Sequence, residues 1–154
     1  MMTVFVTGAI DSGKTSFVRG LAVELARQGR RVAGVLSPAR IERGRKIRYF
    51  VENLRTGFQR PLLERCCGGP RPAAGGFAFG NAVLRRIRSG VAIVDEFGPL
   101  ELAGGGFFTA AKRLARLQGV DLVIVVRRGL APAAAAPLGL RTSHVVDLDA
   151  RRRS

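Results

Sequence analysis

Cysteine and histidine are scarce in this sequence of 154 residues, which has two cysteines and one histidine. Cys66 and Cys67 are adjacent, and adjacent cysteines rarely form a disulfide with each other. Two thiols without a nearby histidine also supply too few ligands for a zinc site. His144 stands apart from the motifs described below, so we expect it at the surface or at a strand end. These absences argue against a disulfide framework, a zinc site and catalysis by histidine.

Long hydrophobic runs are missing as well. No apolar run approaches the roughly 18 to 20 residues that span a bilayer, and the N-terminal stretch MMTVFVTG lacks the pattern of a signal peptide. The chain is 47% hydrophobic, which is enough for one core and hardly enough for two. We therefore expect a soluble cytoplasmic monomer without a membrane segment. Its single domain would span residues 1–150, and residues 151–154 would form a basic tail.

Acidic residues are few, with 11 against 26 basic ones, and the formal net charge is +15. Three of the basic residues are lysines, which leaves 23 arginines. Residues 19–65 carry twelve basic residues and four acids, whereas residues 91–126 carry three and four. Such a regional excess makes a positive face, which attracts nucleotides, nucleic acid or acidic membranes without selecting among them. Nucleic acid therefore stays open as a partner.

Strand and helix patterns alternate along the chain and predict an α/β fold with helices on both faces of the sheet. Apolar runs predict strands at 3–7, 31–37, 91–96, 121–126 and 144–148. Residues 46–54 and 58–64 predict a β-hairpin around the turn RTG. Periodic apolar residues predict helices at 16–29, 79–90 and 107–118. Glycine and proline predict a loop at 66–76, and residues 130–140 predict a short helix or a loop.

Residues 8–15, GAIDSGKT, follow the first predicted strand and lead into the first helix. They match G-x-x-x-x-G-K-[ST], the phosphate-binding loop. Its glycines let successive N–H groups point at phosphate oxygens, and the helix N-terminus adds partial positive charge. In this pattern the lysine reaches the β- and γ-phosphates, and the threonine hydroxyl binds Mg²⁺. The predicted nucleotide-binding residues are Gly8, Ala9, Ile10, Asp11, Ser12, Gly13, Lys14, Thr15 and Ser16.

A second motif, VDEFGPLEL, ends the buried strand at 91–96. We expect this strand to neighbour the first one, which would bring Asp95 close to Thr15 as a second oxygen ligand for Mg²⁺. Glu96 stands beside it, and an unpaired carboxylate near other negative charge is costly. We therefore expect Glu96 to have a function there, as a base or as a group that orients water. The two motifs together favour Mg²⁺-dependent hydrolysis of ATP, GTP or another nucleoside triphosphate.

Three alternatives use the same loop. A regulatory GTPase would fit Asp11 and the DEFG stretch, but none of the lysines lies in an N-K-x-D or T-K-x-D sequence that would read guanine. A P-loop kinase would use Lys14, Thr15 and Asp95, although no arginine-rich lid is evident. A nucleotide-gated nucleic-acid binder or adaptor would use the aromatic and basic residues at 40–60.

The sequence resembles the family of small P-loop nucleoside-triphosphatases that includes a cancer-related NTPase and its archaeal and bacterial relatives. The resemblance rests on VFVTGAIDSGKTSFVRGL, on VAGVLSPARIERGRKIRYFVENLRTG and above all on VDEFGPLEL, which is similar to a D-E-x-G-x-x-E-L signature. It implies a RecA-like P-loop fold, an α/β/α sandwich with a mostly parallel sheet and a β-hairpin insertion. It also implies Mg²⁺-dependent hydrolysis with loose base selectivity.

The resemblance assigns roles to further residues. By position, Glu96 would activate water, Glu101 would shape the site, and Arg128 would stabilise charge in the transition state, with Arg127 as an equal alternative. The loop departs from the family pattern G-x-P-G-x-G-K-T-T, because Ile10 and Asp11 stand at the Pro-Gly positions and Ser16 replaces the second threonine.

Overall fold

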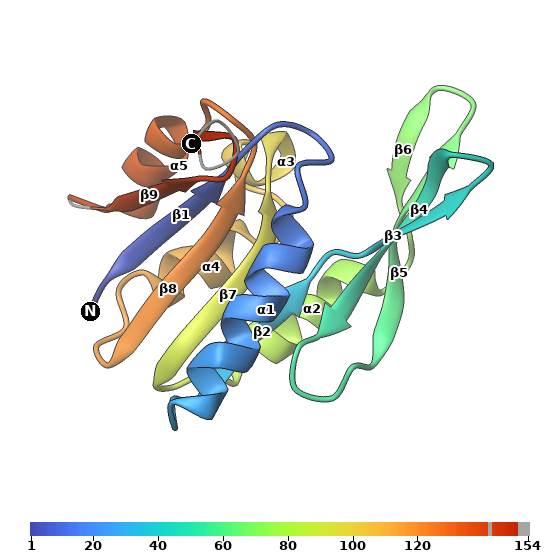
Figure 1. Ribbon diagram of the computed structural model, residues 1–154. Helices are drawn as coiled ribbons and strands as arrows, with labels where there is room; N and C mark the ends of the chain where they lie inside the picture. The colour runs from blue at the N-terminus through green and yellow to red at the C-terminus, as the bar shows by residue number, and fades with distance from the viewer. Residues whose placement is uncertain (142, 151–154) are drawn as a thin grey trace.

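The computed structural model describes residues 1–141 and 143–150 and contains a curved sheet with helices on both faces (Figure 1). Within these ranges the sheet has nine strands, in the order β6-β5-β4-β2-β7-β8-β1-β9, with β3 paired to β4 outside this order. Their bounds are β1 Thr3–Thr7, β2 Val32–Leu36, β3 Ala39–Glu42, β4 Arg45–Asn53, β5 Gln59–Cys66, β6 Gly69–Pro72, β7 Gly90–Phe97, β8 Val120–Val126 and β9 His144–Asp147. The basic tail predicted at 151–154 lies outside the described residues.

One half of the sheet is parallel and comprises β2, β7, β8, β1 and β9. Successive residues of its strands face opposite sides, so Phe5 and Ile124 enter one core while Val6 and Val123 enter the other. Burial on both faces explains why these strands read as continuous apolar runs rather than as alternating patterns. The α/β class and the mostly parallel sheet are confirmed.

The prediction that β1 and β7 are adjacent strands is wrong. β8 pairs with β1 on one side and with β7 on the other, so it separates the strand before the phosphate loop from the strand that carries Asp95. The sequence predicts that both strands are buried, but burial alone does not order them. Two interstrand spacings, about 9.6 Å in all, therefore separate β1 from β7.

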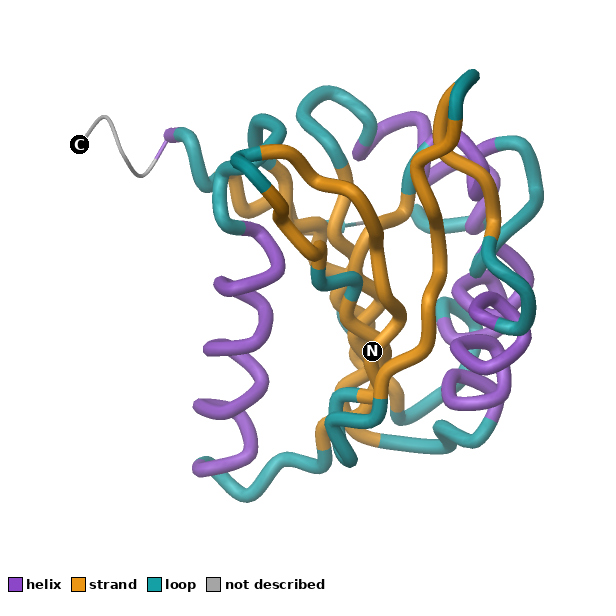
Figure 2. The backbone as a smooth tube through the Cα atoms, turned by 90° about the vertical axis from the view of Figure 1, so that its right-hand side faces the viewer, coloured by secondary structure: helices purple, strands orange, loops and turns teal. Residues whose placement is uncertain are grey.

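Helix α1 covers one face of the sheet, and the remaining helices lie on the other (Figure 2). Val18 and Ala22 of α1 pack on Val6 and Ile93, whereas Leu84 of α2 joins the core of the opposite face. The helices are α1 Lys14–Arg27, α2 Gly76–Arg85, α3 Pro99–Leu102, α4 Phe108–Leu114 and α5 Ala131–Leu138. This arrangement confirms the sandwich of three layers. In the described part of the chain no helix is both long and apolar enough to cross a membrane.

Strands β3 to β6 form an antiparallel extension of the sheet, which projects to the right in Figure 1. The predicted hairpin corresponds to β4 and β5, and β2 joins it to the parallel half through Val35 and Leu36. β3 folds back on β4 through the turn at Arg43 and Gly44, which both adopt positive φ. This second hairpin, β3–β4, was not predicted and lies close to the phosphate loop.

The loop predicted at 66–76 is wrong in part, because it contains strand β6. Cys66 pairs with Gly69 and Leu63 pairs with Pro72. Proline removes a backbone donor, but β6 is the edge of the sheet, where that donor would have no strand to bond. A composition rich in glycine and proline therefore fits an edge strand here as well as a loop.

Three of the helix predictions also change. The helix predicted at 79–90 is α2, which begins at Gly76 and ends at Arg85. The helix predicted at 107–118 is the shorter α4, which ends at Leu114, and α3 precedes it as one unpredicted turn after Gly98. Residues 131–138 form a helix, α5, which decides between the two alternatives for 130–140. Gly139 ends α5 with a left-handed backbone, as helix C-termini commonly do.

Candidate active site

The loop between β1 and α1 is a tight turn that depends on its small residues. A Cβ atom on Gly8 would come within 2.5 Å of the Ser12 hydroxyl oxygen, so a larger residue there would require the Ser12 side chain to move. Gly13 and Asp11 adopt positive φ, 81° and 62°. Asp11 therefore takes the left-handed backbone of the glycine that the family pattern has at this position, and aspartate tolerates that backbone better than most residues. Where the family pattern has a glycine, Asp11 thus accommodates a left-handed backbone and adds a negative charge to the loop.

Lys14, the first residue of α1, folds back over the loop. Its ammonium group donates to the carbonyl oxygens of Gly8 at 3.2 Å and Ala9 at 2.5 Å. Partial burial lowers the pKa of Lys14, while the charges of Glu96 and Asp95 oppose that shift. The lysine is thus a cation held over the concave side of the loop, where a phosphate chain would meet it.

Asp95 lies near the carboxyl end of β7 and is only 1% exposed. One carboxylate oxygen accepts the main-chain N–H of Ser37 at 2.9 Å, and the carboxylate also bonds the hydroxyl of Thr15. Burial raises the pKa of Asp95 to about 6, although the bonds from Ser37 and Thr15 and the charge of Lys14 oppose the rise. Thr15, in the first turn of α1, and Asp95 of β7 are therefore in contact, as the sequence predicts, although β8 lies between β7 and the strand that precedes the loop.

This pair of oxygen ligands fits Mg²⁺. A hydroxyl and a carboxylate are hard donors of the kind that Mg²⁺ prefers. Burial disfavours the ionised carboxylate of Asp95 and raises its pKa, and a divalent cation beside it would supply compensating positive charge.

Glu96 lies where the β7–β8 pairing is interrupted, between Val94 and Phe97. The backbone of Glu96 is left-handed at this irregularity, with φ 70°. Its side chain is 40% exposed, lines the same cavity as the phosphate loop, and pairs with Arg127 at 3.3 Å. The carboxylates of these adjacent residues thus differ in burial. That of Asp95 is buried beside Thr15, and that of Glu96 can contact solvent.

The two neighbouring arginines after β8 separate in the same way. Arg127 lines the cavity, whereas the Arg128 guanidinium bonds Asp149 outside it. Asp149 also accepts the N–H of Ala9 at 2.8 Å, and that bond together with Arg128 holds the pKa of Asp149 below its usual value. The structure therefore brings Arg127 to the site and gives Arg128, the first choice from the sequence, a contact that supports the back of the loop.

Glu101 is 4% exposed and lies inside the turn that follows β7. Its carboxylate accepts the N–H groups of Gly98 at 2.9 Å and Phe107 at 3.3 Å. Burial raises the pKa of Glu101, which these two donors oppose. Glu101 thus fixes the turn beyond Glu96 and has no contact with Lys14 or Thr15.

A cavity of about 670 Å³ is lined by residues 10–16 of the phosphate loop and by Asp95, Glu96 and Arg127. Sequence reasoning missed several of its lining residues, namely Arg19, Ser37, Lys46 and Tyr49. Lys46 reaches the cavity from the β3–β4 hairpin and forms an ion pair with Asp11. The sequence contained one indication that Lys46 is unusual. The chain uses arginine at 23 of its 26 basic positions, and position 46 is one of the few lysines.

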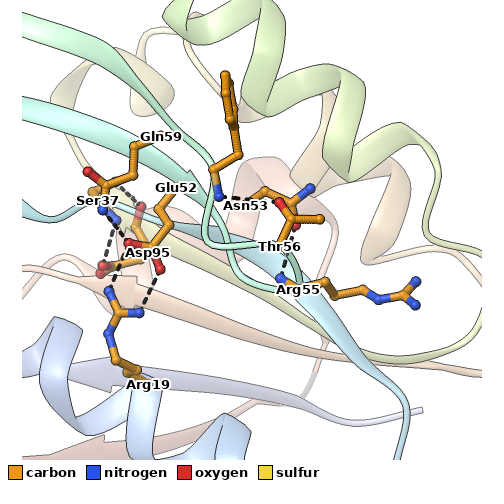
Figure 3. A network of polar contacts seen from close by, with 9 residues as sticks. Arg19, Ser37, Glu52, Asn53, Arg55, Thr56, Gln59 and Asp95 are labelled. Carbon is orange, nitrogen blue, oxygen red and sulfur yellow. Dashed lines mark hydrogen bonds and ion pairs between the residues drawn. The ribbon is translucent and has the colours of Figure 1, made fainter.

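A network of polar side chains holds Arg19, which lines this cavity (Figure 3). The Arg19 guanidinium donates to both carboxylate oxygens of Glu52, at 2.6 and 3.1 Å. Gln59 donates to the same carboxylate at 2.6 Å, and the two donors hold the pKa of Glu52 below its usual value. This pair joins α1 to the β4–β5 hairpin through a buried carboxylate and a half-exposed arginine.

Comparisons with known proteins give consistent matches. A family model described as NTPase matches residues 3–153. The nucleoside-triphosphatase THEP1 of Methanopyrus kandleri is 30% identical over 136 residues, which cover 84% of this chain and 76% of that protein. The THEP1 of Thermococcus kodakarensis is 28% identical over 82% of this chain and 77% of its own.

Two solved structures share the fold. The solution structure of a human cancer-related nucleoside triphosphatase has a TM-score of 0.74 at 23% identity, and covers 96% of this chain and 88% of its own. The crystal structure of THEP1 from Aquifex aeolicus has a TM-score of 0.71 at 20% identity, over 96% and 90% of the two chains.

Proposed function

The chain belongs to the NTPase family of small P-loop nucleoside-triphosphatases, and we propose that it hydrolyses the β–γ phosphoanhydride of ATP, GTP and other nucleoside triphosphates in a Mg²⁺-dependent reaction. The products are a nucleoside diphosphate and inorganic phosphate. The single observation that carries this proposal is the meeting of Lys14, Glu96 and the Thr15–Asp95 pair in one cavity. The proposed place of the reaction is the cytoplasm, which supplies these nucleotides.

The phosphate loop binds and orients the triphosphate. Its main-chain N–H groups and the Lys14 ammonium contact the β- and γ-phosphates, so Lys14 exchanges its bonds to the Gly8 and Ala9 carbonyls for bonds to phosphate oxygens. Thr15 and Asp95 are the residues that would hold Mg²⁺, which supplies positive charge against the phosphate oxygens when it is bound.

Glu96 is the proposed base. It accepts a proton from the attacking water while the water oxygen forms a bond to the γ-phosphorus and the bond from that phosphorus to the β–γ bridging oxygen breaks. The irregularity in β7 supports this role, because it turns the Glu96 side chain into the cavity and leaves Asp95 buried. Arg127 lies against Glu96 and can stabilise the negative charge that develops on the leaving oxygen or the transferred group.

Water is the proposed acceptor rather than a second substrate. Glu96 lines the cavity at the end of β7, and its side chain is 40% exposed. Its ion-pair partner Arg127 is half-exposed as well, so water can reach the carboxylate. This feature favours the hydrolase over the kinase alternative, which would require a bound acceptor molecule.

The test is phosphate release from ATP, GTP, CTP and UTP, each with Mg²⁺ and with EDTA, and with no added acceptor. We expect turnover of several nucleotides by the wild type with Mg²⁺. Glu96→Gln keeps the shape of the side chain and removes the base, so it should bind nucleotide and lose about 10²- to 10⁴-fold in kcat. Nucleotide binding without turnover by the wild type would instead favour the phosphotransferase, and full turnover by Glu96→Gln would remove Glu96 from the mechanism.

A further inference from the structure

Lys46 joins two parts of the chain that are distant in sequence. It stands at the start of β4 opposite Ile41 of β3, and its ammonium group pairs with Asp11 of the phosphate loop. The β3–β4 hairpin therefore reaches over the rim of the cavity and contributes a second lysine to it.

Lys46 lines the same cavity as Lys14 and Glu96, the two groups that act in the proposed reaction. It interacts electrostatically with Asp11 and Glu96, which attract it, and with Lys14, which repels it. Its stem lies beside Tyr49, with the ammonium 5.8 Å from the ring centre. A cation near Glu96 and Lys14 lies near the expected position of the terminal phosphate, because these two groups act on that phosphate.

The ion pair with Asp11 contributes little to holding the hairpin. The Asp11 side chain is 63% exposed and the Lys46 side chain 32%, and pairs this exposed contribute about 0 to 1 kcal/mol. The ladder between β3 and β4 already fixes the hairpin. The pair does neutralise Asp11, whose charge would otherwise repel a triphosphate at the mouth of the loop.

We propose that Lys46 binds the terminal phosphate of the nucleotide, and that Asp11 holds this lysine at the rim of the phosphate loop until the nucleotide arrives. The inference rests on the proposed function and assigns a further substrate-binding residue to the same site. An ammonium group carries three donors and adapts to a phosphate as a point charge, so exchange of the Asp11 carboxylate for a more highly charged phosphate needs only a rotation of the side chain.

The test compares the binding of ATP and ADP, because only ATP has the phosphate that Lys46 would contact. Dissociation constants are measured by calorimetry at fixed salt, in the Glu96→Gln background so that ATP is not consumed. We expect Lys46→Ala to weaken ATP binding about tenfold or more and ADP binding less than about twofold. Lys46→Arg keeps the charge and should recover part of the ATP affinity.

Arg48→Ala is the matched control. Arg48 lies two residues further along β4, pairs with Glu64 and does not line the cavity. Its replacement by alanine removes one positive charge, as Lys46→Ala does. The proposal is overturned if Arg48→Ala loses as much ATP affinity as Lys46→Ala, since bulk charge would then account for the effect. It is also overturned if Lys46→Ala weakens ATP and ADP equally or weakens neither.

These readouts separate the two proposals. If wild-type protein binds ATP without hydrolysing it, the proposed hydrolysis fails, whereas the ATP and ADP constants still decide the role of Lys46. If the wild type binds neither nucleotide, both proposals are wrong.

Discussion

Asp95 and Glu96 are consecutive residues of β7 whose carboxylates lie in different environments. Asp95 is 1% exposed and bonded to Ser37 and Thr15, whereas the Glu96 side chain is 40% exposed and faces Arg127. The irregularity between Val94 and Phe97 produces this division. One carboxylate is therefore suited to a cation and the other to a water molecule, and the two can be tested separately.

Asp95→Asn should stabilise the protein at neutral pH in the absence of nucleotide and divalent cation. The folded-state pKa of Asp95, about 6, lies above the ordinary value of 3.8, so the folded state binds the proton more tightly. The contribution of Asp95 to stability is full below pH 3.8 and falls as the pH rises to about 6. The variant should abolish this fall, and gain at most about 3 kcal/mol at pH 7.5.

The measurement is urea unfolding at pH 4.5 and 7.5 in EDTA. Glu42→Gln is the control, because it removes an exposed carboxylate that is not among the groups acting on Asp95. An Asp95→Asn variant with the same pH dependence as the wild type would contradict the assigned cause. Asp95→Asn should also lose Mg²⁺-dependent phosphate release, since the variant gains stability by losing the charge that the cation needs.

Lys14→Ala should weaken ATP binding by about 10- to 100-fold, because it removes a charge-assisted contact to the phosphates. Equilibrium binding of ATP gives the number. Lys112→Ala is a matched control, since Lys112 lies over the Phe108 ring on α4 and does not line the cavity. Unchanged affinity in Lys14→Ala would count against the phosphate loop as the binding site.

Arg127→Ala and Arg128→Ala should differ although the residues are adjacent. Arg127 faces Glu96 in the cavity, so we expect its loss to lower kcat at least about 100-fold with little change in KM. Arg128 supports the loop through Asp149, which holds the Ala9 N–H, and its loss should act mainly on KM. Steady-state kinetics of both variants decide the matter, and the reverse pattern would restore Arg128 as the catalytic arginine.

Asp11→Asn should bind ATP about two- to fivefold more tightly than the wild type. Asparagine tolerates the left-handed backbone at this position, so the change removes the negative charge and leaves the loop shape intact. Glu42→Gln, at an exposed position of the β3–β4 hairpin, is the isosteric control. Weaker ATP binding by Asp11→Asn would show that the carboxylate assists the ligand rather than opposing it.

Local sequence signals were sufficient for the phosphate loop and for most strands. The run before Gly8 and the helix after Lys14 follow from patterns within about 25 residues, and so does the buried strand that ends at Asp95. The position of β8 between β1 and β7 could not be predicted, because the order of parallel strands depends on which helix faces they cover.

Other parts of the site depend on the direction of single side chains. Arg127 and Arg128 are adjacent residues of the same type, so the sequence does not distinguish them. The backbone at the end of β8 determines which of them faces the cavity. The contact of Lys46 with Asp11 joins segments 35 residues apart through a hairpin whose first strand has no clear apolar alternation. Residues 69–72 carried a misleading signal, since their prolines are tolerated only because β6 is an edge.

The left-handed backbone of Glu96 sets stability and turnover against each other at one position. A residue with a Cβ atom in this conformation costs roughly 1 kcal/mol that glycine would not cost. A library screened for heat resistance alone should therefore enrich glycine or asparagine at position 96, and the selected proteins would survive heating but no longer turn over nucleotide. Glutamate persists at this position only where selection acts on the reaction.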